Sequence, residues 1–174
     1  MATTYNTVKL KKYLDIVEEY TAASAITPGD LVELTSAGLV QRHSTAGGNA
    51  VRMFALENEL EGEGLSDDYA AGDKVQVWCA VPGEIVYARL ADEQNATLAN
   101  FLESAGNGCL QVHSSDAIAE TIASAEDQSA LSLAITVYPM QIVGQILESQ
   151  DLSGLETSES SAVGNSQWVK VRIV

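Results

Sequence analysis

The stretch L-V-E-L-T-S-A-G-L-V-Q-R-H-S at residues 31–44 predicts two short β-strands joined by a tight turn. Its β-rich runs lie on either side of a Ser-Ala-Gly turn, and such short runs bounded by turn residues are typical of strands. Gly38 supplies the positive φ that the turn needs. We therefore expect strands at residues 30–35 and 39–44, paired as a hairpin.

The same pattern returns in the second half of the chain as F-L-E-S-A-G-N-G-C-L-Q-V-H-S at residues 101–114. Each hairpin is followed by an apolar strand that ends in Leu-Glu, then by an acidic loop and a further strand. This order indicates two copies of one β unit, which would pair into a barrel or a sandwich. Aligned without gaps, the two stretches share five identities: Glu33 with Glu103, Gly38 with Gly108, Gln41 with Gln111, His43 with His113 and Ser44 with Ser114.

The chain of 174 residues is long enough for one domain with an ordinary core. Short β-rich runs separated by turn residues predict a mainly β fold, a small β-barrel or sandwich with at most one short helix. We expect an N-terminal arm at residues 1–24 and a single barrel-like domain at residues 25–174. Its two similar units span about 25–91 and 92–174.

Two stretches of the second unit depart from the repeat. An insertion at about 115–139 predicts a short helix at residues 116–126, because alanines and one apolar face are present there. It also predicts one more strand at residues 131–138, which Pro139 ends. Residues 149–167 are rich in Ser, Gly and Glu and are expected to form an exposed loop.

The charge of the chain excludes several classes of partner. Nine Lys and Arg stand against twenty-four Asp and Glu, a formal net charge of -15, and no basic residue lies between Arg89 and Lys170. Affinity for nucleic acid comes mostly from Lys and Arg that neutralise phosphates. We therefore expect no nucleic acid and no membrane among its partners, and no segment is apolar enough to predict a membrane span or a secretory signal.

Residues of the kinds that carry chemistry form no catalytic set. His43 and His113 are the only histidines, and their equivalent positions in the repeat explain them structurally. Cys79 and Cys109 have no neighbour at metal-ligand spacing and are expected to be buried thiols. The acidic stretch at residues 57–68 lacks the spacing of a calcium loop, which favours a solvated loop over a weak divalent site. We predict no enzyme, no metal and no cofactor.

The N-terminal arm combines apolar and basic side chains. Within residues 7–20 the apolar positions fit one face of a helix and one face of a strand equally well, so periodicity leaves both open. The arm lies outside the expected repeat. It could pack on a neighbouring chain or form the first strand of its own barrel.

Several turn and strand motifs resemble a known family. The stretches are I-T-P-G-D-L-V-E-L-T from Ile26, F-A-L-E-N-E-L-E-G from Phe54, S-D-D-Y-A-A-G-D-K-V-Q-V-W from Ser66, P-G-E-I-V-Y-A-R-L-A from Pro82, N-F-L-E-S-A-G-N-G-C-L from Asn100, G-Q-I-L-E-S-Q-D-L-S-G from Gly144, and the final V-K-V-R-I-V. Together they resemble the capsid decoration, or cement, proteins that stabilise the heads of tailed bacteriophages. The likeness runs from about residue 9 to residue 174 and is weakest in the insertion.

This resemblance implies a β-tulip-like barrel that is made in the host cytoplasm and assembles, as a homotrimer, on the outer surface of the virion capsid. Its partners would be the major capsid protein and other copies of itself, and no cofactor is implied. The arm is then the expected contact segment. The predicted interaction residues are Val8, Lys9, Leu10, Lys11, Lys12, Tyr13, Leu14 and Ile16.

Two other classes of function compete with this one. A surface binding module that recognises a glycan or the host envelope would quench Trp78 or Tyr69 on binding. A hydrolase with paired carboxylates has no support beyond the number of acidic residues. Trp78 and Trp168 lie on comparable strands, which favours packing in a core or an interface for both.

Overall fold

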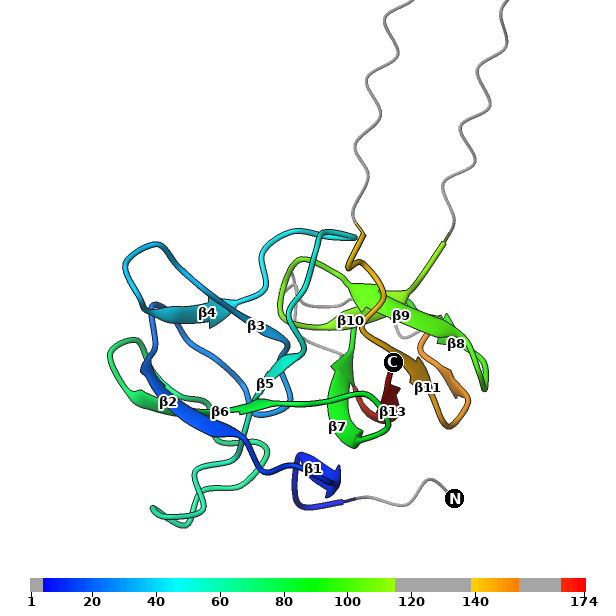
Figure 1. Ribbon diagram of the computed structural model, residues 1–174. Coiled ribbons are helices and arrows are strands. Elements are labelled where there is room, and N and C mark those ends of the chain that lie inside the picture. Colours follow the sequence, from blue (N-terminus) through cyan, green and yellow to red (C-terminus); the bar gives the residue numbers. More distant parts are fainter. Residues whose placement is uncertain (1–4, 115–138, 154–166) are drawn as a thin grey trace, which may run out of the picture.

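The computed structural model describes residues 5–114, 139–153 and 167–174, and β-strands are the only regular elements in these ranges (Figure 1). The predicted mainly β barrel is therefore confirmed. The helix expected at residues 116–126 and the strand expected at residues 131–138 lie outside the described residues. The strands are β1 (Lys9–Lys11), β2 (Val17–Thr21), β3 (Val32–Leu34), β4 (Val40–Arg42), β5 (Met53–Ala55), β6 (Lys74–Cys79), β7 (Ile85–Leu90), β8 (Asn95–Ala96), β9 (Phe101–Ser104), β10 (Leu110–Val112), β11 (Gly144–Ile146), β12 (Gln150–Asp151) and β13 (Gln167–Ile173).

The second half of the chain forms a closed five-stranded barrel, on the right of Figure 1. Its strands follow the order β7, β10, β9, β11 and β13, and β13 pairs with β7 to close the ring. Only the pairing of β10 with β7 is parallel. Closure leaves these five strands with neighbours on both sides, which removes most exposed edges.

The first half repeats this order with weaker connections, on the left of Figure 1. Strands β2, β6 and β5 form one sheet, and β3 and β4 form a second. Two isolated bridges join the sheets, a parallel one from Ala22 to Val40 and an antiparallel one from Leu31 to Phe54. They complete a ring in the order β2, β4, β3, β5 and β6, which is the order of the second barrel.

The registers of the two rings also correspond. The parallel bridge between Ala22 and Val40 matches the parallel pairing of Leu90 with Leu110. Leu31 opposite Phe54 likewise matches Phe101 opposite Gln145. In each hairpin, the glutamine also donates to the glutamate opposite it, Gln41 to Glu33 at 2.8 Å and Gln111 to Glu103 at 2.9 Å. The two similar β units expected from the sequence are therefore present in strand order, register and side-chain contacts.

Strand pairing divides the chain differently from the units expected at 25–91 and 92–174. The strand β2, which was expected within the arm at residues 1–24, is the first strand of the first ring. The strand β7, which was expected to end the first unit, opens the second ring. The repeat visible in sequence begins only at each hairpin, so it gave no signal for the strand that precedes the hairpin.

Two groups of buried side chains fill the rings. The first ring encloses a small cluster that includes Val32, Val40 and Val77. A larger cluster fills the second barrel and continues across the junction to Leu31, Phe54 and Trp78. The two rings therefore share a continuous apolar contact.

Gly144 lies where β11 passes very close to β13. A Cβ atom at this position would contact Val171 Cγ1 and would lie 2.7 Å from the carbonyl oxygen of Arg172. Overpacking of this kind usually costs about 1–3 kcal/mol. We expect Gly144→Ala to lower the midpoint of thermal unfolding, measured by calorimetry, by several degrees. Gly64→Ala is the control, because a Cβ there would meet only Asp67 Oδ2, at 3.8 Å; an equal effect of both variants would contradict the close approach.

Candidate interaction surface

The structure divides the eight residues predicted for interaction into a buried and an exposed group. Val8, next to β1, is fully buried, and Lys9 and Leu10, within β1, are half-buried. The strand β1 pairs with β7 of the same chain, so this part of the arm packs on its own barrel. The exposed group consists of Lys11, Lys12, Tyr13, Leu14 and Ile16.

The segment between β1 and β2 exposes several apolar side chains close together in the sequence. Tyr13 is 63% exposed, Leu14 53%, Ile16 44% and the neighbouring Val17 38%. Large apolar side chains scattered singly over a surface are normal, whereas several together mark a site of interaction. We call residues 13–17 the apolar loop.

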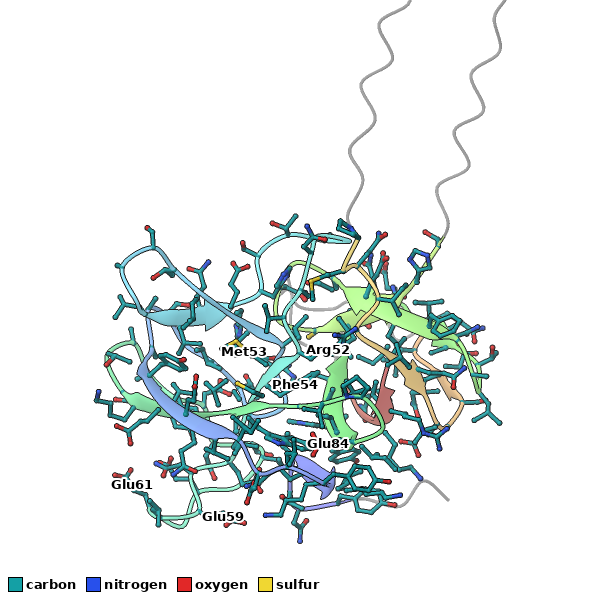
Figure 2. All side chains as sticks on the ribbon, in the orientation of Figure 1. Arg52, Met53, Phe54, Glu59, Glu61 and Glu84 are labelled. Atoms are coloured by element: carbon teal, nitrogen blue, oxygen red, sulfur yellow. The ribbon has the colours of Figure 1, made fainter. Side chains whose placement is uncertain are left out.

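A buried carboxylate holds the backbone of the apolar loop in place. Glu84 is fully buried, and its Oε1 accepts hydrogen bonds from the backbone N–H groups of Tyr13 at 2.7 Å and Leu14 at 2.9 Å. Its Oε2 accepts a third from Val81 N–H at 2.7 Å. Hydrogen bonds to a charged acceptor are about twice as strong as neutral ones. Figure 2 shows Glu84 at the junction of the two rings.

Two further hydrogen bonds hold the N-terminal segment against the core. The indole Nε1 of Trp78 donates to the carbonyl oxygen of Leu14 at 3.3 Å. The backbone N–H of Val8 donates to Glu57 Oε2 at 3.0 Å. The loop therefore presents its apolar side chains on a backbone that is bonded to the core, and little conformational entropy remains to be lost on binding.

Charged side chains lie within the apolar loop and on its N-terminal side. Asp15 forms ion pairs with Lys12 and, at 3.2 Å, with Lys9. Hydrogen bonds from Lys12 and then from Lys9 lower the pKa of Asp15. The Nζ of Lys11 lies 5.1 Å from the ring centre of Tyr13. The surface thus combines exposed apolar side chains with charged ones, as protein interfaces do.

Sequence reasoning missed a buried ionic cluster between the rings. Asp30 is fully buried, and its carboxylate accepts from Arg89 Nη1 at 3.0 Å and Arg42 Nε at 2.7 Å. It also accepts from the backbone N–H of Thr27 at 2.9 Å. Arg42 belongs to the first ring and Arg89 to the second. Asp30 therefore ties the two halves together.

The histidines and cysteines take structural positions. His43 is buried, with Nδ1 at 2.8 Å from Ser104 Oγ and Nε2 at 2.9 Å from the carbonyl oxygen of Asn49. His113 Nδ1 lies 2.5 Å from Glu103 Oε2. Cys79 is half-buried, which raises the pKa of its thiol, and Cys109 is buried. The contacts of the two histidines are contacts within the scaffold.

The acidic stretch forms a loop, on which Glu59 and Glu61 point away from the barrels (Figure 2). Within the described ranges, no group of three or more His, Cys, Asp or Glu side chains is arranged to hold a metal ion. A helix long and apolar enough to cross a membrane is likewise not found in the part of the chain that the structure describes.

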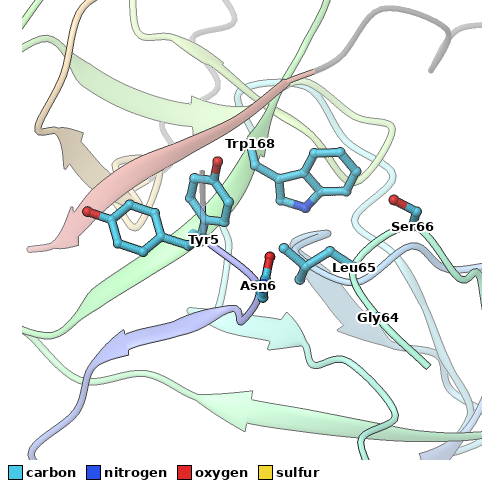
Figure 3. Close-up of a pocket in the computed structure, with 7 residues that line it drawn as sticks. Tyr5, Asn6, Gly64, Leu65, Ser66 and Trp168 are labelled. Carbon is cyan, nitrogen blue, oxygen red and sulfur yellow. The ribbon is translucent and has the colours of Figure 1, made fainter. Parts of the chain in front are cut away.

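An aromatic pocket lies between the N-terminal segment and the second barrel (Figure 3). Its volume is about 240 Å³. The rings of Tyr5 and Tyr87 meet edge to face, with centres 5.3 Å apart. The Nε1 of Trp168 donates to the carbonyl oxygen of Pro28 at 3.0 Å, so the indole is held in place. The pocket is lined by Tyr5, Asn6, Gly64, Leu65, Ser66, Tyr87 and Trp168.

Comparison of the chain with models of known protein families finds no match, and comparison with curated proteins finds none either.

Proposed function

We propose that this chain is a structural virion protein, a capsid decoration or cement protein that binds the outer surface of the major capsid protein lattice and stabilises the mature head. The observation that carries the proposal is the apolar loop, because its exposed side chains stand on a backbone bonded to the buried Glu84. Such a loop is suited to docking on another protein. The motifs that resemble decoration proteins supply the identity of the partner.

A small docking surface is sufficient for a capsid coat, because many copies bind together. Burying one side chain of the size of Leu or Ile contributes about 1.5–3 kcal/mol, so one loop alone gives modest affinity. A homotrimer brings three such loops to a site of local symmetry, and linked contacts bind far more tightly than single ones. A net charge of -15 favours solubility and mutual repulsion of decorated particles, and disfavours contact with DNA.

The double variant Tyr13→Ser with Leu14→Ser tests the loop directly. Because both side chains are exposed and their backbone contacts remain, we expect the midpoint of thermal unfolding to stay nearly unchanged. Loss of this apolar contact should weaken binding to undecorated capsids about tenfold or more. Sedimentation of capsids with labelled protein measures both the affinity and the saturating stoichiometry.

Leu60→Ser is the matched control, since Leu60 is 86% exposed on the acidic loop. It should bind capsids like the unaltered chain. Binding of the double variant at full affinity would move the contact surface elsewhere on the protein. If the unaltered chain stays in the supernatant, or adds no resistance of the capsids to heat or chelator, the decoration proposal fails as a whole.

A glycan-binding module is the second candidate, and the aromatic pocket favours it. Aromatic rings beside polar groups such as Asn6 and Ser66 are the usual surroundings of a small ligand. Trp78 is fully buried and Tyr69 is buried, so Trp168 replaces them as the fluorescent reporter. Saturable quenching of Trp168 by cell-surface oligosaccharide, lost in Trp168→Phe, would favour this function.

A further inference from the structure

The correspondence of the two rings reveals an edge that is covered in one ring and open in the other. In the second ring, β1 lies along the outer edge of β7, with Lys9 opposite Val86 and Lys11 opposite Ile85. The backbone N–H of Tyr87 donates to the carbonyl oxygen of Val8 at 2.8 Å. The start of β7 therefore has a strand on both sides, β13 and β1.

The equivalent edge of the first ring is the start of β2. Ala22 corresponds to Leu90, because both make the parallel bridge to the second strand of the hairpin. Val17 then corresponds to Ile85, and each faces a residue of the ring's last strand, Trp78 and Arg172 respectively. Val17–Glu19 is thus the position that β1 would cover if it lay on the first ring.

The backbone groups of this edge point outward. Cys79 N–H donates to the carbonyl oxygen of Ile16 at 2.9 Å. In an antiparallel pair the bonded residues alternate, so Glu18 also faces β6 while Val17 and Glu19 face away from it. Among the described residues, the outward N–H and C=O groups of Val17 and Glu19 have no hydrogen-bonding partner. An edge of this kind is a template for pairing with another strand.

The charges around the edge define what fits it. Glu18 and Glu19 are exposed on the strand itself. Glu61, Glu63 and Asp73 line the adjoining hollow with Glu19, and only Lys74 among its lining residues is basic. The strand that covers the equivalent edge, β1, has the sequence Lys-Leu-Lys. An added strand with Lys or Arg would complement these carboxylates, whereas an acidic one would be repelled.

We propose that the edge of β2 at Val17–Glu19 takes an extended, Lys- or Arg-rich segment of a partner chain as an added antiparallel strand. Main-chain hydrogen bonds supply the affinity in this mode of recognition, and side-chain charge supplies the selection. The inference does not depend on the proposed function, because it rests on the open backbone groups and the acidic surroundings alone.

The probe is a peptide with the chain's own sequence Y-N-T-V-K-L-K-K-Y, residues 5–13, which already pairs with the equivalent edge of β7. Fluorescence anisotropy of the labelled peptide should show saturable binding to the full chain. Binding should weaken several-fold from low salt to about 0.5 M salt, because exposed charges are screened. Hydrogen exchange should slow at the amides of Val17 and Glu19 and stay unchanged at Glu18. A peptide with Glu in place of each Lys should not bind.

Glu19→Pro removes one outward N–H and leaves the bonds from β2 to β6 in place, as proline on an edge strand does. It should weaken peptide binding about tenfold or more, an effect of about 1.4 kcal/mol. Asp68→Asn is the control, because Asp68 is exposed and does not line this hollow; it should bind nearly as the unaltered chain does. Equal binding by Glu19→Pro and the unaltered chain would overturn the proposal.

Peptides that are N-methylated at alternate residues test the edge without altering the protein. Only one of the two alternating sets of amides can face β2, so one methylated peptide should lose binding and the other should keep it. Equal binding of both would overturn the proposal. Concentration-dependent association of the chain with itself that is lost in Glu19→Pro would assign the edge to a second copy, and would overturn its assignment to a different partner chain.

Discussion

Replacement of Asp30 by alanine is expected to lower the free energy of unfolding by about 3–5 kcal/mol, because it removes one partner of a buried ion pair, the carboxylate to which Arg89 donates. Asp30 accepts hydrogen bonds from Arg89, Arg42 and the backbone of Thr27, and it is fully buried. For a chain of this size the corresponding fall in the unfolding midpoint is roughly 6–20 °C. Calorimetry and chemical denaturation measure both quantities.

The same variant tests how the two rings are coupled. Asp30 connects Arg42 of the first ring with Arg89 of the second, so we expect the unaltered chain to unfold in one transition and Asp30→Ala to broaden or split it. Asp30→Asn keeps an acceptor oxygen, so its stability should lie between that of the unaltered chain and that of Asp30→Ala. Asp68→Ala, on the exposed acidic stretch, is the control and should change little. A loss of stability below about 1 kcal/mol in Asp30→Ala, the size of an exposed ion pair, would contradict this account.

The hairpins could be predicted from the sequence because their contacts are local. Gly38 and Gly108 both adopt positive φ in the turns, and the strands that flank each turn pair with one another. The pairs that close the rings join β2 to β6 and β7 to β13, far apart in the chain. Alternation of apolar residues shows which face of a strand is buried and does not identify its neighbours. The closure of the rings and the strand at which each repeat begins could therefore not be predicted from the sequence.

The exposed and the buried residues of the arm could not be told apart from the sequence. Apolar residues in the arm indicated a contact segment, and the structure exposes Tyr13, Leu14 and Ile16 while it buries Val8. The backbone of Val8 is bonded to Glu57 and that of Tyr13 and Leu14 to Glu84, and no local pattern shows these long-range contacts. Arg89 alternates with apolar residues as an outward-facing residue would.

The other ring covers the side of β7 on which Arg89 lies. The backbone N–H of Arg89 donates to the carbonyl oxygen of Gly29 at 3.2 Å, and its side chain donates to Asp30. In the sequence, Asp30 follows Pro28 and Gly29 and has the composition of an ordinary turn. Its burial arises only when the two rings meet. The ionic cluster was therefore invisible to any reading of one strand or one turn by itself.

Glu84→Ala is expected to separate the two roles of the apolar loop, its side chains and its fixed backbone. The variant leaves three backbone N–H groups, those of Tyr13, Leu14 and Val81, without their acceptor. Each hydrogen bond to a buried charged group contributes about 1.5–3 kcal/mol, and water that enters the site replaces part of this loss. We therefore expect the free energy of unfolding to fall by about 3 kcal/mol or more. Hydrogen exchange at the amides of Tyr13 and Leu14 should accelerate about a hundredfold or more, since that factor corresponds to only about 2.8 kcal/mol.

Under the proposed function, capsid binding should fall in Glu84→Ala although every apolar side chain of the loop remains, because the entropy lost when a flexible loop is ordered on binding reduces the affinity. Glu84→Gln retains one acceptor oxygen and should keep part of both the protection and the binding. Glu59→Ala, on the exposed acidic loop, removes the same charge without these bonds and should match the unaltered chain. Unchanged exchange at Tyr13 and Leu14 in Glu84→Ala would show that another group anchors the loop. Faster exchange with undiminished capsid binding would place the docking surface outside the loop, since a preorganised contact cannot be loosened without loss of affinity.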